Sequence, residues 1–399
     1  MSDFSNRTHY KYLIVGGGMT ADAAMHGIRE VDAAGAIGLI GGEEHPPYDR
    51  PPLSKALWKG KPLDSIWRKT ENTGVELHLG RTVRNLEPLA KQVEDDEERC
   101  FTFDKLLLAT GGTPRRLPFG GDDIIYYRAL NDYQRLRSLT ETGRNFVVIG
   151  GGFIGSEVAA ALAMNGMRVT LAFPDEGIGA RIYPRDLSLF LNDFFRQKGV
   201  DVLTGESVSG MERQGNGFSL MTQGGRTLEA DGVVAGIGIR PDVELAQKAD
   251  LTVDNGILVD EHLRTAHPDI YAAGDVANFY NPALGQRMRV EHEDNANSMG
   301  TAAGRAMAGA VEPYHHLPFF YSDLFDLGYE GVGELDARLE TVTDWKDPYR
   351  EGVIYYLHNG RVRGVLLWNI WKQVDAARHL IAEPGPFSAQ NLKGRLPAG

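Results

Sequence analysis

Three small residues with a fixed spacing follow the first apolar stretch of the sequence. Gly16, Gly18 and Ala21 come directly after the run YLIV, and small helix-forming residues follow. Gly16 permits a tight turn, Gly18 lets the backbone approach a pyrophosphate, and Ala21 allows the next helix to pack closely on the strand. The N-terminus of that helix would face the phosphates. The pattern is typical of a dinucleotide-binding turn.

The same arrangement occurs a second time in the chain. Gly150, Gly152 and Gly155 follow the run NFVVI and precede another helix-forming stretch. One such turn is weak evidence, because glycine turns between a strand and a helix also occur without a ligand. Two complete units favour the interpretation that the chain binds two dinucleotides.

Acidic residues follow the second strand of each unit. The first such strand, Ile37–Ile40, leads to Glu43 and Glu44, either of which could accept a ribose hydroxyl. The second, Arg168–Phe173, leads to Asp175, where an acid should hold the adenosine ribose.

The segment PYDRPPLSK lies between the two units. Pro51 and Pro52 fix φ and predict an extended path before Ser54 can begin a helix. Such a path could direct Arg50 and Lys55 at a phosphate and a ring. Without the glycine turns, a stiff loop would be the preferred interpretation.

Further strands should end near these turns. Phe103–Leu108 and Gly232–Gly238 both run into glycines, as crossings between two nucleotide domains would. Asp275 follows the short strand in DIYAAGD, where its carboxylate could hold a ribityl chain. A helix rich in small residues follows Arg289, and its N-terminus, near His292, would stabilise negative charge. A histidine at such a turn is, taken alone, more often structural.

Length and composition narrow the class of protein. With 399 residues, two or three domains are expected, and a net charge of −12 disfavours nucleic-acid binding. The sequence has no apolar run of about 18 residues and no cleavable signal at its start, so we expect a cytoplasmic protein without a membrane span. Cys100 is the single cysteine, so a disulfide or a Cys-x-x-Cys redox pair within the chain is excluded.

The order of these motifs resembles the FAD-dependent pyridine nucleotide–disulfide oxidoreductase superfamily. PYDRPPLSK, ATGGTPR, GGGFIGSE, AGD and the tail GVIYYLHNGRVRGVLLWNIW are similar to the group of apoptosis-inducing factors and oxygenase-coupled ferredoxin reductases. The resemblance implies an α/β fold with two Rossmann-like dinucleotide-binding domains and a C-terminal α+β domain. It implies a discontinuous FAD domain of 1–120 and 241–317, an NAD domain of 121–240 and a C-terminal domain of 318–399.

Carried over position by position, the resemblance implies two sets of binding residues and no metal site. The FAD set is Gly16, Gly18, Ala21, Glu43, Arg50, Lys55, Val83, Arg115, Asp275, Glu291, His292 and Tyr321. The NAD set is Gly150, Gly152, Phe153, Ile154, Gly155, Glu157, Asp175, Arg181, Gly238, Glu330 and Asn369, with Glu291 also beside the nicotinamide. Tyr321 stands where the family has a tryptophan.

The resemblance implies hydride transfer from NADH to FAD, with Lys55 and Glu157 as the catalytic pair. The lysine would stabilise the electron-rich reduced ring, and the glutamate would neutralise the lysine at rest. A structural ion pair between two domains is the alternative.

The sequence also predicts which coenzyme is preferred. Asp175 and Glu176 should oppose the 2′-phosphate of NADPH, although Arg181 could partly compensate their charge. NADH is therefore expected to be preferred over NADPH.

The electron acceptor has several candidates. Because the chain has no cysteine pair, electrons should pass directly to a ferredoxin, a quinone or oxygen. A basic patch of Arg361, Arg363 and Lys372 could receive an acidic [2Fe–2S] ferredoxin.

The alternative function is an NADH sensor, similar to apoptosis-inducing factor, in which a stable charge-transfer complex controls dimerisation. The protein would accordingly be a monomer or an NADH-dependent homodimer.

Aromatic residues of the tail are expected mainly in the core: Trp345, Trp368, Trp371, Tyr355 and Tyr356.

Overall fold

The computed structural model describes residues 7–396, and its internal contacts divide the chain into two compact units. Unit 1 comprises Met1–Asp49, Asp64–Thr113 and Arg240–Pro318, and unit 2 comprises Arg50–Leu63, Pro114–Ile239 and Phe319–Gly399. The chain passes between the units at five points, and two of these lie inside short strands, β7 (Gly112–Pro114) and β16 (Ile239–Pro241). The limits of the three domains expected from the sequence stay a prediction.

A seven-stranded sheet forms the centre of unit 1. Its strands are β1 (Arg7–Val15), β2 (Ile37–Gly41), β3 (Glu76–Leu79), β4 (Val83–Glu87), β5 (Gln92–Asp95), β6 (Cys100–Leu108) and β18 (Ile270–Ala272). The order is β3-β2-β1-β6-β5-β4, and β18 also pairs with β6. β1, β2, β3, β6 and β18 run parallel, and the ends of β1 and β6 are apolar and buried on both faces, as parallel strands usually are.

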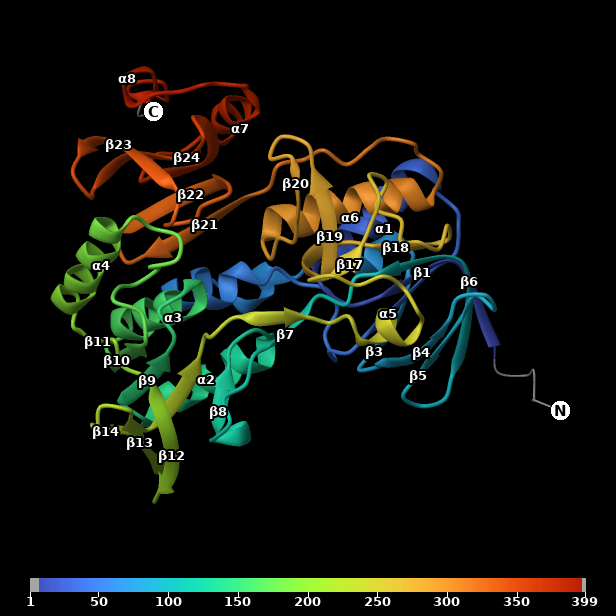
Figure 1. The fold of residues 1–399 in the computed structure, drawn as a ribbon. Coiled ribbons are helices and arrows are strands. Elements are labelled where there is room, and N and C mark those ends of the chain that lie inside the picture. Colours follow the sequence, from blue (N-terminus) through green and yellow to red (C-terminus); the bar gives the residue numbers. More distant parts are fainter. Residues whose placement is uncertain (1–6, 397–399) are drawn as a thin grey trace. The chain divides into compact units, whose positions relative to one another are not determined.

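Two long helices of unit 1, α1 (Met19–Val31) and α6 (Glu293–Met307), lie side by side (Figure 1). Their backbones approach so closely that a Cβ at Gly300 or Gly304 would collide with carbonyl groups of α1. The small residues of 293–307 therefore form a tightly packed helix, as the sequence indicates. Unit 1 also contains α5 (Glu244–Lys248) and a three-stranded sheet of β17 (Ile257–Leu258), β19 (Ala277–Asn281) and β20 (Gln286–Met288).

Unit 2 contains a second parallel sheet. Its order is β11 (Val200–Thr204), β10 (Arg168–Phe173), β9 (Asn145–Ile149), β15 (Gly232–Ala235) and β8 (Ile124–Tyr126). The helices of this part are α2 (Leu130–Thr142), α3 (Phe153–Met164) and α4 (Arg185–Gln197). An antiparallel sheet of β12 (Val208–Gln214), β13 (Gly217–Thr222) and β14 (Thr227–Ala230) completes it.

The C-terminal part of unit 2 is a five-stranded antiparallel sheet with two helices. Its order is β21 (Phe319–Leu324), β22 (Leu327–Gly333), β25 (Arg361–Trp368), β24 (Glu351–His358) and β23 (Glu340–Asp347), and α7 (Val374–Ala382) and α8 (Ala389–Leu392) follow. The predicted fold class, α/β with two Rossmann-like domains and a C-terminal α+β domain, is confirmed.

One local expectation was wrong. Ser54 does not begin an α-helix: Pro51–Ser54 and Ala56–Lys59 are single 3₁₀ turns, and Arg50 before them is helical rather than extended. The aromatic residues of the tail lie mainly in the core, as expected: Trp368, Tyr355 and Tyr356 are fully buried and Trp345 is half-buried. Trp371 is the exception, at 44% exposed.

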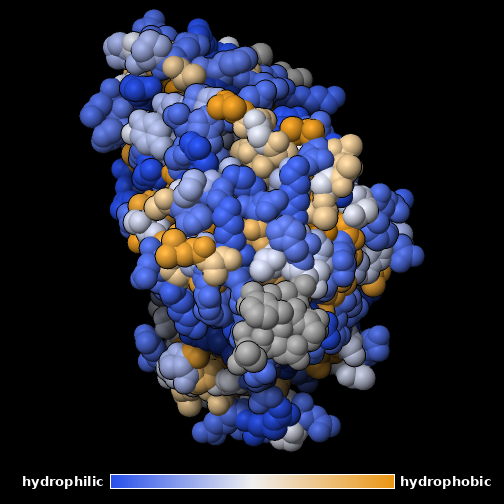
Figure 2. Space-filling view, turned by 90° about the vertical axis from the view of Figure 1, so that its right-hand side faces the viewer, coloured by the Kyte–Doolittle hydropathy of each residue, from blue (hydrophilic) through white to orange (hydrophobic). Residues whose placement is uncertain are grey.

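On the face shown in Figure 2, hydrophilic side chains predominate and apolar ones are scattered. Within residues 7–396, no helix is both long and apolar enough to cross a membrane.

Candidate functional site

The first glycine turn lies at the carboxyl edge of the sheet of unit 1. Val15 is in register with Ile40 and Leu108, and Leu108 with Ala272, so four parallel strands end together. Gly16 follows with φ 127°, and a Cβ there would collide with the carbonyl of Ala109. The edge beside the central strand is where open α/β sheets bind their ligands.

The first turn of α1 fits a pyrophosphate. Gly18 is the N-cap with an extended backbone, no side chain caps the helix, and Ala21 is fully buried against the sheet. Asp22, also in the first turn, would repel a phosphate, but Arg68 Nε donates to its carboxylate at 2.6 Å and Thr70 Oγ1 at 2.5 Å. This arginine was missed from the sequence, since it lies outside every motif.

The other predicted FAD residues of unit 1 lie around this edge. Glu43 follows β2 and accepts a hydrogen bond from Tyr48 Oη at 2.5 Å, whereas Glu44 is exposed. Val83 begins β4, two residues after Arg81, whose N–H bonds the carbonyl of Gly41. 

Three more predicted residues come from the segment after β18. Asp275 lies in the 3₁₀ turn Gly274–Val276, and His292 is the N-cap of α6. Glu291 forms an ion pair of 2.5 Å with Arg289. Whether each of these binds FAD stays a prediction.

The second glycine turn, in unit 2, has the same construction. Gly150 follows β9 with φ 114°, and a Cβ there would collide with the carbonyl of Gly236. A Cβ at Gly155 would collide with the carbonyl of Gly150. Gly152 is the N-cap of α3 and faces open space. The turn therefore leaves room for a second pyrophosphate at a helix N-terminus.

Two more predicted residues lie beside each other in unit 2. The carbonyl of Gly238, which has φ 91°, accepts a hydrogen bond from the backbone N–H of Arg115 at 2.9 Å.

The first two residues of α3 are also predicted to bind NAD. Phe153 is half-buried, and Ile154 is 36% exposed. The ring of Phe153 meets that of Phe320 edge-on, with 5.2 Å between centroids.

The acidic residues after β10 are arranged asymmetrically. Glu176 is bound by Arg185 through two hydrogen bonds, of 2.7 and 2.9 Å. Asp175 is half-buried and has no cation within ion-pair distance among residues 7–396. Arg181 is exposed, and its backbone carbonyl accepts the N–H of Ala337. The negative charge that remains uncompensated is therefore that of Asp175.

Lys55 and Glu157 meet in unit 2. Lys55 Nζ lies 2.7 Å from Glu157 Oε2, and their side chains are 12% and 3% exposed. Lys55 Nζ also lies 5.3 Å from the centre of the ring of Tyr321. Arg50, at the start of the same segment, donates to the carbonyl of Arg128 at 3.1 Å.

Two serines that the sequence did not single out as site residues complete the surroundings of Glu157. Ser54 Oγ donates to Oε2 and Ser322 Oγ to Oε1, each at 2.5 Å. Ser54 stands next to Lys55 in the motif PYDRPPLSK, and this neighbour is the only signal that could have found it. Ser322 lies in an apolar strand and carries no local signal.

Buried phenols lie near the same carboxylate. Burial raises the pKa of Tyr183 and of Tyr329 above the ordinary value, and the negative charge of Glu157 adds to both shifts. Burial likewise raises the pKa of Tyr127. The hydroxyls of these three tyrosines are therefore neutral.

The last two predicted NAD residues lie in the C-terminal sheet. Glu330 pairs in register with Tyr321, and burial raises the pKa of its carboxyl. Asn369 has φ 51°, and its side chain bonds Gly328 of β22 and the carbonyl of Arg350, just before β24. Whether Asn369 also binds NAD stays a prediction.

The expected basic patch does not come together. Arg361 begins β25 and Lys372 lies beyond its other end, so the length of the strand, about 23 Å, separates them. Arg363 is paired with Glu334 at 2.7 Å.

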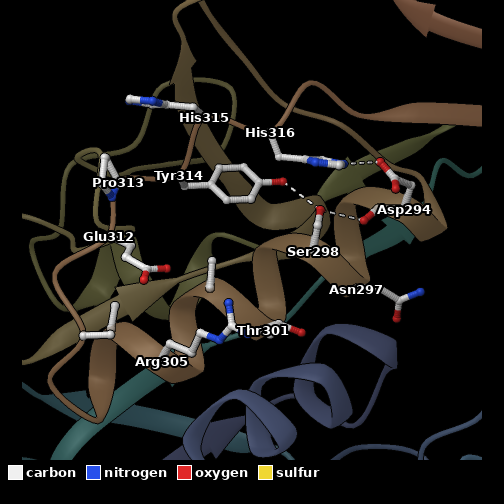
Figure 3. Close-up of a pocket in the computed structure, with 13 residues that line it drawn as sticks. Asp294, Asn297, Ser298, Thr301, Arg305, Glu312, Pro313, Tyr314, His315 and His316 are labelled. Carbon is white, nitrogen blue, oxygen red and sulfur yellow. Dashed lines mark hydrogen bonds and ion pairs between the residues drawn. The ribbon is translucent and has the colours of Figure 1, made fainter. Parts of the chain in front are cut away.

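A hollow of about 660 Å³ in unit 1 contains none of the predicted residues (Figure 3). It lies between α6 and residues 310–316. His316 Nε2 and Asp294 Oδ2 are hydrogen-bonded at 2.6 Å, and Ser298 bonds Tyr314 at 2.9 Å. Those contacts fasten the chain after α6 to the first turns of the helix.

Comparisons with known proteins agree with this geometry. The model of the pyridine nucleotide–disulphide oxidoreductase family matches residues 10–300, and that of the C-terminal domain of mitochondrion-associated apoptosis-inducing factor matches 303–347 and 343–383. Apoptosis-inducing factor 1 of Dictyostelium discoideum is 35% identical, over 93% of this chain and 78% of its own. The ferredoxin–NAD(+) reductase component of the anthranilate 1,2-dioxygenase system of Burkholderia cepacia is 34% identical, over 96% of each.

A solved structure is also similar over nearly the full length. The reductase in the covalent putidaredoxin reductase–putidaredoxin complex superposes with a TM-score of 0.89 at 30% identity, covering 98% of this chain and 96% of that chain. These findings confirm the resemblance expected from the motifs. The chain belongs to the pyridine nucleotide–disulphide oxidoreductase family, and it is an FAD-dependent oxidoreductase that uses NAD(H).

Proposed function

We propose that this protein transfers a hydride from NADH to FAD and then passes electrons to a small iron–sulfur ferredoxin. The observation that carries the first half is the buried Lys55–Glu157 ion pair in unit 2. The second half is supported by relatives whose names state ferredoxin reductase activity, and by the likeness to a reductase solved together with putidaredoxin. 

The chain's own residues supply binding and electrostatics. The two glycine turns would hold the pyrophosphates, and Asp175 would accept hydrogen bonds from the ribose hydroxyls of NADH. Bound FAD would supply a ring that can take up a hydride and give up electrons one at a time. Lys55 would stabilise negative charge on that ring, and Glu157 would balance the charge of Lys55 at rest. Because the sequence has one cysteine, Cys100, no dithiol relay operates within the chain.

Rapid mixing without oxygen tests this function. The FAD-loaded protein is mixed with NADH, and loss of the visible absorbance of oxidised flavin is followed. A [2Fe–2S] ferredoxin is then added, and bleaching of its iron–sulfur absorbance is measured. Failure of NADH to reduce the flavin would exclude the first half, and failure to reduce any ferredoxin while a quinone is reduced would exclude the second.

A second candidate function is NADH sensing. The C-terminal match to the apoptosis-inducing factor domain favours it. In that case the NADH-reduced protein would persist in air for many minutes and would elute as a dimer on a sizing column.

A further inference from the structure

Glu157 of α3 is surrounded by hydrogen-bond donors from two other segments of unit 2. Ser54 and Lys55 follow the two prolines, Glu157 lies in the second turn of α3, and Ser322 lies in β21. All four side chains are buried or nearly so, and the exposed fraction of Ser322 is only 1%. The C-terminal sheet therefore reaches the carboxylate that pairs with Lys55.

The two serine contacts have the length of charge-assisted hydrogen bonds. Each Oγ–O distance is 2.5 Å, at the short end of the range for a hydroxyl that donates to a carboxylate. Ser54 bonds the same oxygen as Lys55, and Ser322 bonds the other one. Both oxygens of Glu157 are thus held, which fixes the rotation of the carboxylate as well as its position.

Donors of this kind favour the ionised form of a buried acid. Burial alone would favour the protonated form, and hydrogen bonds to the charged form oppose that effect. If Glu157 held a proton, a serine that now donates would have to turn toward another acceptor. For Ser54 the next acceptor is the carbonyl of Pro51, at a long 3.5 Å. The serines and Lys55 therefore act together to keep the carboxylate charged.

We infer that Ser54 and Ser322 are positioning residues for the hydride step: they keep Glu157 ionised and oriented toward Lys55. This inference rests on the proposed function of the Lys55–Glu157 pair. It also assigns a role to the C-terminal sheet, because Ser322 supplies half of the clamp on Glu157.

The test is an infrared titration of the oxidised, FAD-loaded protein. The carboxyl band of Glu157 is identified by subtracting the spectrum of Glu157→Gln. In the double variant Ser54→Ala/Ser322→Ala, the protonated band should appear at a pH about one unit or more above that of the wild type. NADH should reduce its flavin at least about tenfold more slowly at neutral pH. The rate should fall further as the pH is lowered through the new midpoint.

Two further variants separate positioning from folding. Ser54→Thr keeps a hydroxyl and should restore most of the rate. Ser219→Ala removes a half-buried serine of β13 that bonds Glu229 at 3.0 Å and should leave both titration and rate unchanged. If the double variant loses FAD, the two single variants are titrated in its place.

An unchanged carboxyl titration in the serine variants would overturn the inference, even if flavin reduction became slower. If the wild type is not reduced by NADH at all, the proposed function fails instead. The infrared titration would then still decide whether the serines hold Glu157 in its charged form.

Discussion

Lys55 and Glu157 form an ion pair that is almost completely removed from solvent, with Nζ and Oε2 at 2.7 Å. One turn further along, Lys59 pairs with Asp323 at 3.0 Å, but these side chains are 44% and 36% exposed. Exposed pairs contribute about 0–1 kcal/mol, whereas a buried charge is costly unless it has a partner or a function. This contrast provides a matched test of the catalytic role.

We expect Lys55→Ala to slow reduction of the flavin by NADH by about 100-fold, because the positive charge that stabilises the reduced ring is lost. Stopped-flow absorbance measures the rate, and bound FAD is quantified in the same sample. Lys59→Ala should retain the wild-type rate. If Lys55→Ala with full FAD content also retained it, the pair would be structural.

Asp175 should set the preference for NADH. Arg185 compensates Glu176, so the charge that opposes a 2′-phosphate is that of Asp175. The wild type should favour NADH over NADPH by at least about tenfold in kcat/KM, and Asp175→Ala should remove most of this preference. Asp193→Ala, an exposed acid paired with Arg196, serves as the control. Equal kcat/KM for both coenzymes in the wild type would contradict the assignment.

Tyr321 should speed the release of NAD⁺. A tyrosine offers a smaller aromatic face than the tryptophan of the family, and its hydroxyl needs a hydrogen-bond partner. Tyr321→Trp should lower the dissociation constant of NAD⁺ from the reduced protein by about threefold to tenfold. Anaerobic equilibrium titration measures it, with Tyr280→Trp, at a position that is 51% exposed, as the control. Weaker binding in the Tyr321→Trp variant would argue against stacking.

Glu330 should make the folded protein less stable as the pH rises. Burial raises the pKa of its carboxyl above the ordinary 4.5, and its buried Oε2 has no hydrogen-bond partner among residues 7–396. Between the pKa of the unfolded chain and that of the folded protein, the folded state therefore holds a proton that the unfolded chain has lost. The stability that this proton contributes is fully present below pH 4.5 and is lost as the pH rises through the pKa of the folded state.

Glu330→Gln should consequently raise the melting temperature at neutral pH, and the gain should vanish below pH 4.5. Thermal unfolding across this range measures the difference. Glu340→Gln changes an exposed residue of the same sheet and should give a flat difference. A neutral-pH loss of stability in Glu330→Gln would show that the carboxylate has a favourable partner.

Much of the framework could be predicted because its signals are local. The strand Arg168–Phe173 has the bounds expected from the sequence, and both glycine turns occur where backbone collisions exclude a side chain. The small residues of α6 indicated close helix packing before the neighbour was known. Turn geometry and helix contacts of this kind depend on a few adjacent residues.

The remaining features depend on contacts between distant segments. Ser322 has no local pattern that distinguishes it from any other serine in a strand, and only the packing of β21 brings it to Glu157. Pro51 and Pro52 fix φ near −65°, which suits a 3₁₀ turn as well as an extended path, so the local sequence could not decide between them. Arg361 and Lys372 are near in sequence, but Arg361 begins β25 and Lys372 lies beyond the other end of that strand.

The most direct test of the central claim is to mix the NADH-reduced protein, in separate anaerobic experiments, with a [2Fe–2S] ferredoxin and with a quinone, and in a third with oxygen. We predict that the ferredoxin reoxidises the flavin at least about tenfold faster than oxygen does, and that Cys100→Ser has the same rates as the wild type. A reduced protein that persists in the presence of all three acceptors and elutes as a dimer would contradict the account.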